Sequence, residues 1–237
     1  MYNMRNNRSF GGSRYQYQTL PYGYEGTQAS GLISKVMGLL ATSFLSAFVG
    51  TFIGMFLGLG VGSYFLVVIA GFIVLFALQF MIQKPGINLF LLYLFTFLEG
   101  MSLAPLVSYY ASINGNILGQ AFLITAIVAL GLSFYAWTTK RDFTRIGDYL
   151  FVGLILLLVV SIIGLFFHSS LVVLAISFFG VAIFSGYVLY YVQRARTMAD
   201  TMPNAIGLTV SLFLTLLNLF LYILQILAIL QGGNRRR

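Results

Sequence analysis

Long apolar runs separated by short polar links dominate the chain from residue 33 onward. There are seven such runs, near 33–56, 63–83, 87–109, 117–137, 149–167, 171–191 and 205–230. A helix needs about 20 apolar residues to cross a bilayer, and every run except the fifth clearly reaches that length. The pattern therefore predicts an all-α integral membrane protein with seven transmembrane helices, joined as antiparallel hairpins by short connections.

The last run, 205–230, carries no charged residue, and its polar residues repeat with helical spacing. Ser211, Thr215 and Asn218 lie four and three residues apart, so they share one helix face. An apolar helix with one polar stripe favours a place inside a bundle, because neighbouring helices offer hydrogen-bond partners that lipid lacks. We therefore expect this helix to be packed among the others.

The chain has a basic tail at each end, outside the apolar runs. Residues 1–31 are rich in Asn, Gly, Tyr and Arg, and they hold too little apolar surface to fold alone. We expect a cytoplasmic tail that lies on the membrane surface or, alternatively, docks on a partner protein. Because no apolar segment precedes residue 32, the first span is expected to direct insertion without a cleavable signal peptide. The predicted membrane domain is 32–230, followed by a short basic C-terminal tail, 231–237.

Composition agrees with membrane residence. The chain is 59% hydrophobic and only 8% charged, whereas soluble domains carry about 25% charged residues. The net charge of +8 does not indicate a nucleic-acid partner, because the basic residues form short tracts beside apolar runs, where anionic lipid headgroups would meet them. The candidate lipid contacts between the runs are Lys140, Arg141, Arg145, Arg194 and Arg196. We expect the lipid bilayer as a partner, and no cofactor.

The basic residues also predict how the chain is oriented. The links near 57–62, 110–116 and 168–170 contain no charged residue, and the alternate links carry the lysines and arginines. The positive-inside rule then places the N-terminus in the cytoplasm. Seven crossings leave Arg235 to Arg237 on the opposite side, so either this short basic tail is translocated or one run is re-entrant.

Three glycines follow one another at steps of four where the first run ends. They are Gly50, Gly54 and Gly58. Small residues at this spacing let a neighbouring helix approach closely. We expect close helix packing at this stripe, the alternative being a glycine-lined pore wall.

Glu99 is the one acidic residue inside a predicted span, and Thr96 and Ser102 lie three residues to either side on the same face. An isolated carboxylate at that depth is costly and marks a candidate functional site. No Lys or Arg lies deep in a span to pair with it. Two interpretations stay open: a protonated Glu99 hydrogen-bonded across helices, or a group that handles protons or cations. Pro105 is expected to kink the same span.

Other chemistry finds little support in the sequence. There is no cysteine, which excludes disulfides, thiolate nucleophiles and thiolate metal sites. His168, the only histidine, falls in a predicted uncharged loop, and one histidine is thin support for a metal site. The aspartates Asp142, Asp148 and Asp200 fall in predicted cytoplasmic links, so the spans hold no aspartate pair. We predict no metal site, no catalytic residue and no enzymatic activity.

Several segments together resemble the Bax inhibitor-1 family of membrane proteins. They are 92–105, 121–126, 133–144, 184–190 and 218–225, with Ser34-Lys-Val-Met in the first run. The resemblance implies a seven-helix fold whose last helix is central and surrounded by the other six. It also implies bacterial or organellar membranes, so we expect the cell (inner) membrane, and an association with a pH-sensitive calcium leak. The resemblance further implies an association with suppression of cell death in eukaryotes and, in bacteria, with modulation of a membrane-bound ATP-dependent protease.

The chain departs from that family pattern at the pH sensor, a pair of aspartates in the sixth and seventh helices. Tyr191 and Thr215 stand at the corresponding positions, and the associated basic residue of the second span is absent as well. The resemblance thus implies that a charged gate is replaced by neutral contacts, and calcium loses its best ligands there. Calcium binding stays open.

Two functions remain in view. The first is a cation or calcium leak channel that has lost the pH-sensing pair. The alternative is a non-transporting accessory subunit or modulator of another membrane complex, such as a membrane-bound ATP-dependent protease. The lost pair favours the second function, and the retained Glu99 favours the first.

Overall fold

The computed structural model of the chain describes residues 25–58, 61–164, 166–167 and 169–233. They form the helices α1 (Glu25–Phe56), α2 (Val61–Met81), α3 (Ile87–Ser102), α4 (Ala104–Thr138), α5 (Gly147–Gly164), α6 (Ser170–Ala195) and α7 (Met202–Gly233), with the 3₁₀ turn η1 (Thr144–Ile146) before α5. Seven stretches of these helices are long and apolar enough to cross a membrane. The prediction of an all-α protein with seven spans is confirmed.

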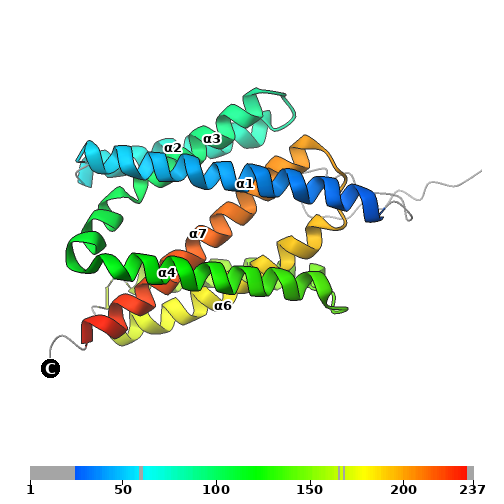
Figure 1. Cartoon of the computed structure of the whole chain (residues 1–237). Helices are drawn as coiled ribbons and strands as arrows, with labels where there is room; N and C mark the ends of the chain where they lie inside the picture. The colour runs from blue at the N-terminus through cyan, green and yellow to red at the C-terminus, as the bar shows by residue number, and fades with distance from the viewer. Residues whose placement is uncertain (1–24, 59–60, 165, 168, 234–237) are drawn as a thin grey trace, which may run out of the picture.

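The helices form two layers, and α7 runs diagonally between them (Figure 1). α1, α2 and α3 make up one layer, and α4, α5 and α6 the other. The first half of α7 packs on the first layer through Ile206 and Phe213, and the second half packs on the other layer through Leu219 and Leu224. Of the seven apolar windows, that of α7 has the largest buried share, 39%. The last helix is therefore the central one.

The six other helices surround α7 at two distances. α1, α3, α4 and α6 pack directly on α7, whereas α2 packs on α3, and α5 packs on α6. Only 6% of the apolar window of α5 is buried, and its outward side chains, such as Phe151 and Leu158, are apolar as lipid requires. Four helices thus make the direct contacts with α7, and two complete the ring from outside.

The third predicted span is broken at Leu103. α3 ends at Ser102, and α4 begins at Ala104 with Pro105 in its first turn. Proline is tolerated there because the first residues of a helix have no partner for their N–H groups. The expected kink therefore coincides with a one-residue interruption of the helix at Leu103. The reversal expected in a loop near 110–116 occurs within helical residues instead, where the start of α4 bends back across the bundle (Figure 1).

Glycines bring α1 and α3 into backbone contact. A Cβ added at Gly100 would collide with the backbone of Ala47, and one added at Gly50 would collide with the carbonyl of Phe97. The Thr51 hydroxyl uses this proximity and donates a hydrogen bond to the Gly100 carbonyl oxygen at 2.7 Å. The predicted close packing at Gly50 is therefore present, and Gly100 supplies the matching small residue on α3.

The other two glycines of the stripe differ from each other. A Cβ at Gly54 would lie 2.7 Å from that of Ala104, so Gly54 is also a packing glycine. Gly58 lies beyond the end of α1 with a φ of 60°, and among the described residues no atom would approach its added Cβ within 4 Å. Its role is to turn the chain in the left-handed region, which glycine enters at no steric cost. The packing predicted for Gly58 is therefore wrong.

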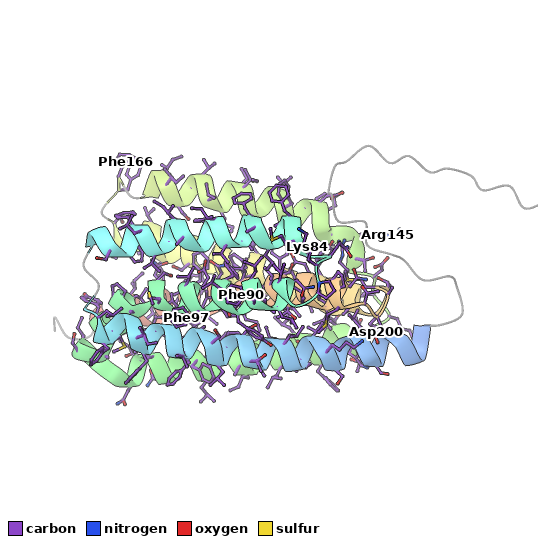
Figure 2. All side chains as sticks on the ribbon, turned by 90° about the horizontal axis from the view of Figure 1, so that it is seen from above. Lys84, Phe90, Phe97, Arg145, Phe166 and Asp200 are labelled. Atoms are coloured by element: carbon purple, nitrogen blue, oxygen red, sulfur yellow. The ribbon has the colours of Figure 1, made fainter. Side chains whose placement is uncertain are left out.

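Charged side chains gather at one end of the bundle. Lys84, Arg145 and Asp200 lie at this end, and Phe166 lies at the opposite one (Figure 2). The Lys35 Nζ bonds the Asp200 Oδ1 at 2.9 Å, which ties α1 to the link between α6 and α7. We call this the charged end below.

The predicted tails are shorter than expected where the structure describes them. α1 begins at Glu25, so residues 25–31 are helical, and α7 continues to Gly233. The rest of the N-terminal tail, His168 and residues 234–237 lie outside the described residues.

Candidate functional site

Glu99 lies on α3 where that helix faces α2. A Cβ added at Gly71 of α2 would lie 3.7 Å from the Glu99 Oε1, so the carboxylate occupies the space left by this glycine. In the described part of the chain, this carboxylate has no hydrogen bond or ion pair. The interpretation of Glu99 as a structural group hydrogen-bonded across helices thus finds no partner there.

Glu99 lines a cavity of about 690 Å³ between α2, the α3–α4 break and α7, here called the Glu99 cavity. Ser102 and Asn218 add polar groups to its wall. Phe65 and Phe72 of α2 also line it, and they are 58% and 57% exposed, so the cavity opens toward the lipid-facing surface. A carboxylate near the centre of a span is therefore reachable from the side of the bundle.

A smaller cavity of about 260 Å³ lies beside the Glu99 cavity along α7. Asn218 lines both cavities, and Tyr110 and Gln225 line the smaller one. The Gln225 Oε1 accepts a hydrogen bond from the Ser177 hydroxyl at 2.6 Å. Polar groups thus follow α7 from Glu99 toward the end of the bundle opposite the charged end.

Thr96 and Ser102, predicted on the face of Glu99, have different surroundings. Ser102 lines the Glu99 cavity, and its hydroxyl donates to the backbone carbonyl of Glu99 at 2.7 Å. Thr96 is fully buried and donates to the carbonyl of Tyr93 at 3.2 Å. The structure brings Ser102 to the cavity and places Thr96 in the packed interior.

The polar side chains of α7 donate their hydrogen bonds within the helix itself. Ser211, Thr215 and Asn218 each donate to the carbonyl of the residue four positions earlier, at 3.0, 2.7 and 2.8 Å. Such bonds pair the donors within the helix, so the face does not depend on neighbouring helices for them. The side-chain oxygen of Asn218, as a hydrogen-bond acceptor, adds to the polarity of the cavities.

Tyr191 and Thr215 stand where the resemblance to the family implies aspartates. The Tyr191 ring stacks on Tyr187 with centroids 5.6 Å apart, and Thr215 is buried and bonds the Ser211 carbonyl. Neither contact joins the two side chains. Tyr187 is buried as well, so these two rings pack within the protein.

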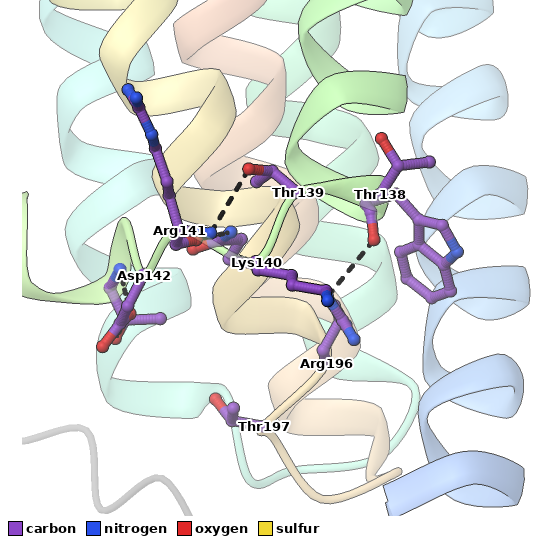
Figure 3. Close-up of a pocket in the computed structure, with 10 residues that line it drawn as sticks. Thr138, Thr139, Lys140, Arg141, Asp142, Arg196 and Thr197 are labelled. Atoms are coloured by element: carbon purple, nitrogen blue, oxygen red, sulfur yellow. Dashed lines mark hydrogen bonds between the residues drawn. The ribbon is translucent and has the colours of Figure 1, made fainter.

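A third cavity, of about 570 Å³, lies at the charged end and is here called the basic cavity (Figure 3). The loop after α4 and the end of α6 form it. Gln193 of α6 holds this loop: its Nε2 donates to the Arg141 carbonyl at 2.7 Å, and its Oε1 accepts from the Phe143 N–H at 2.5 Å. Gln193 is buried, and sequence reasoning missed it; an amide at the end of an apolar run was the available signal.

The five candidate lipid contacts separate into two groups. Lys140, Arg141 and Arg196 line the basic cavity (Figure 3). Arg145 and Arg194 are not among its lining residues. Basic residues that are neighbours in sequence therefore have different roles in space.

The second group makes contacts within the protein. Arg145 pairs with Asp142 at 3.2 Å, and Arg194 donates a hydrogen bond to the Tyr190 hydroxyl. Hydrogen bonds from Thr144 hold the pKa of the Asp142 carboxyl below its usual value, helped by the charge of Arg145. Asp142 is therefore ionised at neutral pH.

Fold and site together define a polytopic helical membrane protein in which a carboxylate beside the central helix is paired with no other described residue. Residues 29–232 match the family described as inhibitor of apoptosis-promoting Bax1. The chain therefore belongs to the Bax inhibitor-1 family, as the sequence predicted.

Similar proteins come from bacteria, a virus and a mammal. An uncharacterised protein of Campylobacter jejuni is 41% identical over 65% of this chain and 66% of its own length. The Golgi anti-apoptotic protein of vaccinia virus (strain Lister) is 32% identical over 65% of this chain and 64% of its own. Protein lifeguard 4 of Mus musculus is 33% identical over 65% and 63%. The chain thus spans just under two thirds of the length of these relatives.

Proposed function

We propose that the chain is a cation-leak protein in which Glu99, and not an aspartate pair, is the ionisable group that meets the permeating ion. The observation that supports this proposal is a carboxylate in the Glu99 cavity that no described residue hydrogen-bonds or pairs. A charged side chain at the bilayer centre costs about 2.5–3.5 kcal/mol on translocon scales. A carboxylate without a hydrogen bond or ion pair does not offset this cost by stabilising the fold. Polar Ser102 and Asn218 line the same cavity and would help to solvate an ion there.

The ion would be held weakly. Ca²⁺ takes about 6–8 oxygen ligands. The described residues contain no cluster of three or more His, Cys, Asp or Glu suited to a metal ion. We therefore propose that a proton or a partly hydrated cation visits Glu99, and that any calcium flux passes without tight binding.

Ion flux into proteoliposomes tests this function. The full chain is reconstituted, and uptake of K⁺, Ca²⁺ and protons is followed with entrapped dyes. We expect Glu99→Gln to lower the flux about tenfold, as for the loss of about 1.4 kcal/mol of stabilisation. Asp148→Asn, which removes an acidic residue at the start of α5 outside the Glu99 cavity, is the matched control. Equal flux in Glu99→Gln and the wild type would contradict the proposal.

We further propose that the charged end faces the cytoplasm of a bacterial inner membrane. Lys84, Lys140, Arg141 and Arg196 belong to this end, and positive charge accumulates on the cytoplasmic side. The relatives from Campylobacter jejuni and Vibrio cholerae support a bacterial cell membrane. The C-terminal end of α7 then lies on the opposite side.

A second candidate function is that of a non-transporting accessory subunit or modulator, for example of a membrane-bound ATP-dependent protease. It is favoured by the packed, uncharged contacts of Tyr191 and Thr215, which leave no titrating pair at the family's sensor. This function predicts no flux in proteoliposomes and a stoichiometric membrane partner after mild solubilisation.

A further inference from the structure

The basic cavity has a lining that is unbalanced in charge. Lys140, Arg141 and Arg196 contribute three positive charges, and Asp142 contributes the one negative charge. The Asp142 carboxylate is engaged by Thr144 and Arg145, so its charge is already compensated. The cavity therefore presents a net positive surface that is available to an anion.

The walls of the basic cavity are held in place before any ligand arrives. Gln193 fixes the loop through its buried amide, and the Arg141 N–H donates to the Thr139 hydroxyl at 3.2 Å. The Arg196 guanidinium lies 5.1 Å from the ring centroid of Trp137 and donates to the Trp137 carbonyl at 3.3 Å. A preformed site saves the free energy of ordering these groups on binding.

Donors remain free in this cavity. Arg196 uses one of its nitrogens for the Trp137 carbonyl, and the Lys140 ammonium has no partner in the described part of the chain. The planar fork of an arginine matches phosphate oxygens, and a lysine adds a point charge. The Thr139 hydroxyl lines the same space, and because it accepts the Arg141 N–H, its own hydrogen can be donated to an anion.

We propose that the basic cavity binds a phosphate-bearing anion, either a phospholipid headgroup or free phosphate. Its position between the ends of α4 and α6 is the level at which headgroups lie, and Trp137, 46% exposed, is typical of that interface. A volume of about 570 Å³ accommodates a headgroup, since small-molecule sites measure about 300–1,000 Å³. This site is independent of the function proposed for Glu99.

Trp137 lines the cavity and can report on it by fluorescence, because it is the only tryptophan of the chain. The full chain is reconstituted in phosphatidylcholine vesicles that hold a fixed fraction of either brominated phosphatidylglycerol or brominated phosphatidylcholine. We expect the phosphatidylglycerol to quench Trp137 more strongly at the same fraction. Lys140→Gln and Arg141→Gln should each weaken this preference about fivefold, the effect of one cation near an anionic headgroup.

Lys84→Gln is the matched control, because it removes one exposed charge from the same end of the bundle outside the cavity. Equal quenching by the two brominated lipids would overturn the assignment of the bound anion to a lipid headgroup. A loss of preference as large in Lys84→Gln as in Lys140→Gln would reduce the effect to general surface charge and overturn the site.

Inorganic phosphate separates the two sources. A change in Trp137 emission on adding phosphate to phosphatidylcholine vesicles, absent in Lys140→Gln, assigns the site to free phosphate. A preference for phosphatidylglycerol that phosphate does not compete away assigns it to the headgroup. No response to either anion overturns the proposal.

Discussion

Among single residues, Glu99 combines two properties that rarely occur together: depth in the membrane and access from lipid. The exposed Phe65 and Phe72 leave its cavity open on the lipid side. A hydrophobic carbodiimide partitions into lipid and reacts with protonated carboxyl groups, so we expect dicyclohexylcarbodiimide to modify Glu99. A water-soluble carbodiimide should modify exposed acids such as Asp148 instead. Peptide mass spectrometry reads both patterns, and labelling that persists in Glu99→Gln would contradict the assignment.

Tyr191 and Thr215, where the resemblance implies a lost pH sensor, make a second prediction at this scale. Neither tyrosine, with a usual pKa of about 10, nor threonine titrates near neutral pH. Tyr191→Phe combined with Thr215→Val should therefore leave the change in flux between about pH 6 and 8 within about twofold of the wild type. Proteoliposome flux at several pH values measures this. A strong pH response that the double variant abolishes would show that the family's gate persists without its carboxylates.

At the scale of elements, the close contact of α1 with α3 depends on glycines, which have no side chain. Because a Cβ at Gly100 would strike the Ala47 backbone, Gly100→Ala must push the two helices apart. We expect a loss of about 2 kcal/mol or more in the free energy of unfolding, in the range for overpacked sites. Unfolding of the detergent-solubilised chain by increasing SDS, followed by circular dichroism, measures it.

The chain supplies a matched control for this substitution. Gly131 lies within α4, and among the described residues no atom would approach its added Cβ within 4 Å. Gly131→Ala should leave stability unchanged or raise it by up to about 1 kcal/mol, because alanine is the better helix former. Equal effects at the two glycines would mean that the α1–α3 contact does not limit stability.

For the whole molecule, an odd number of crossings places the start of α1 and the end of α7 on opposite sides of the membrane. α1 starts at the charged end, and the end of α7 lies at the other (Figure 1). We expect an alkaline phosphatase fusion at residue 237 to be active, and one within 138–148 to be inactive. Green fluorescent protein fusions should give the reverse pattern. Cytoplasmic signals from both positions would instead indicate a re-entrant run.

The sequence by itself determined the class, the number of spans and the break near Pro105. These features follow from local quantities: the length of apolar runs, the position of charges and the missing N–H of proline. It also identified Glu99 as the one acidic residue inside a predicted span, because a carboxylate in an apolar run is visible without any contact. Family membership likewise rested on short segments that can be compared one by one.

Tertiary structure alone decided how each helix is rotated and what it touches. In a membrane, side chains that face lipid are as apolar as those that face the core, so periodicity does not reveal the buried face. This is why Thr96 proved to be interior while Ser102 lines the cavity, and why Gly58 turns the chain instead of packing. Lys140 and Arg196 are far apart in sequence, and they line one cavity because buried Gln193 holds the loop after α4 against the end of α6.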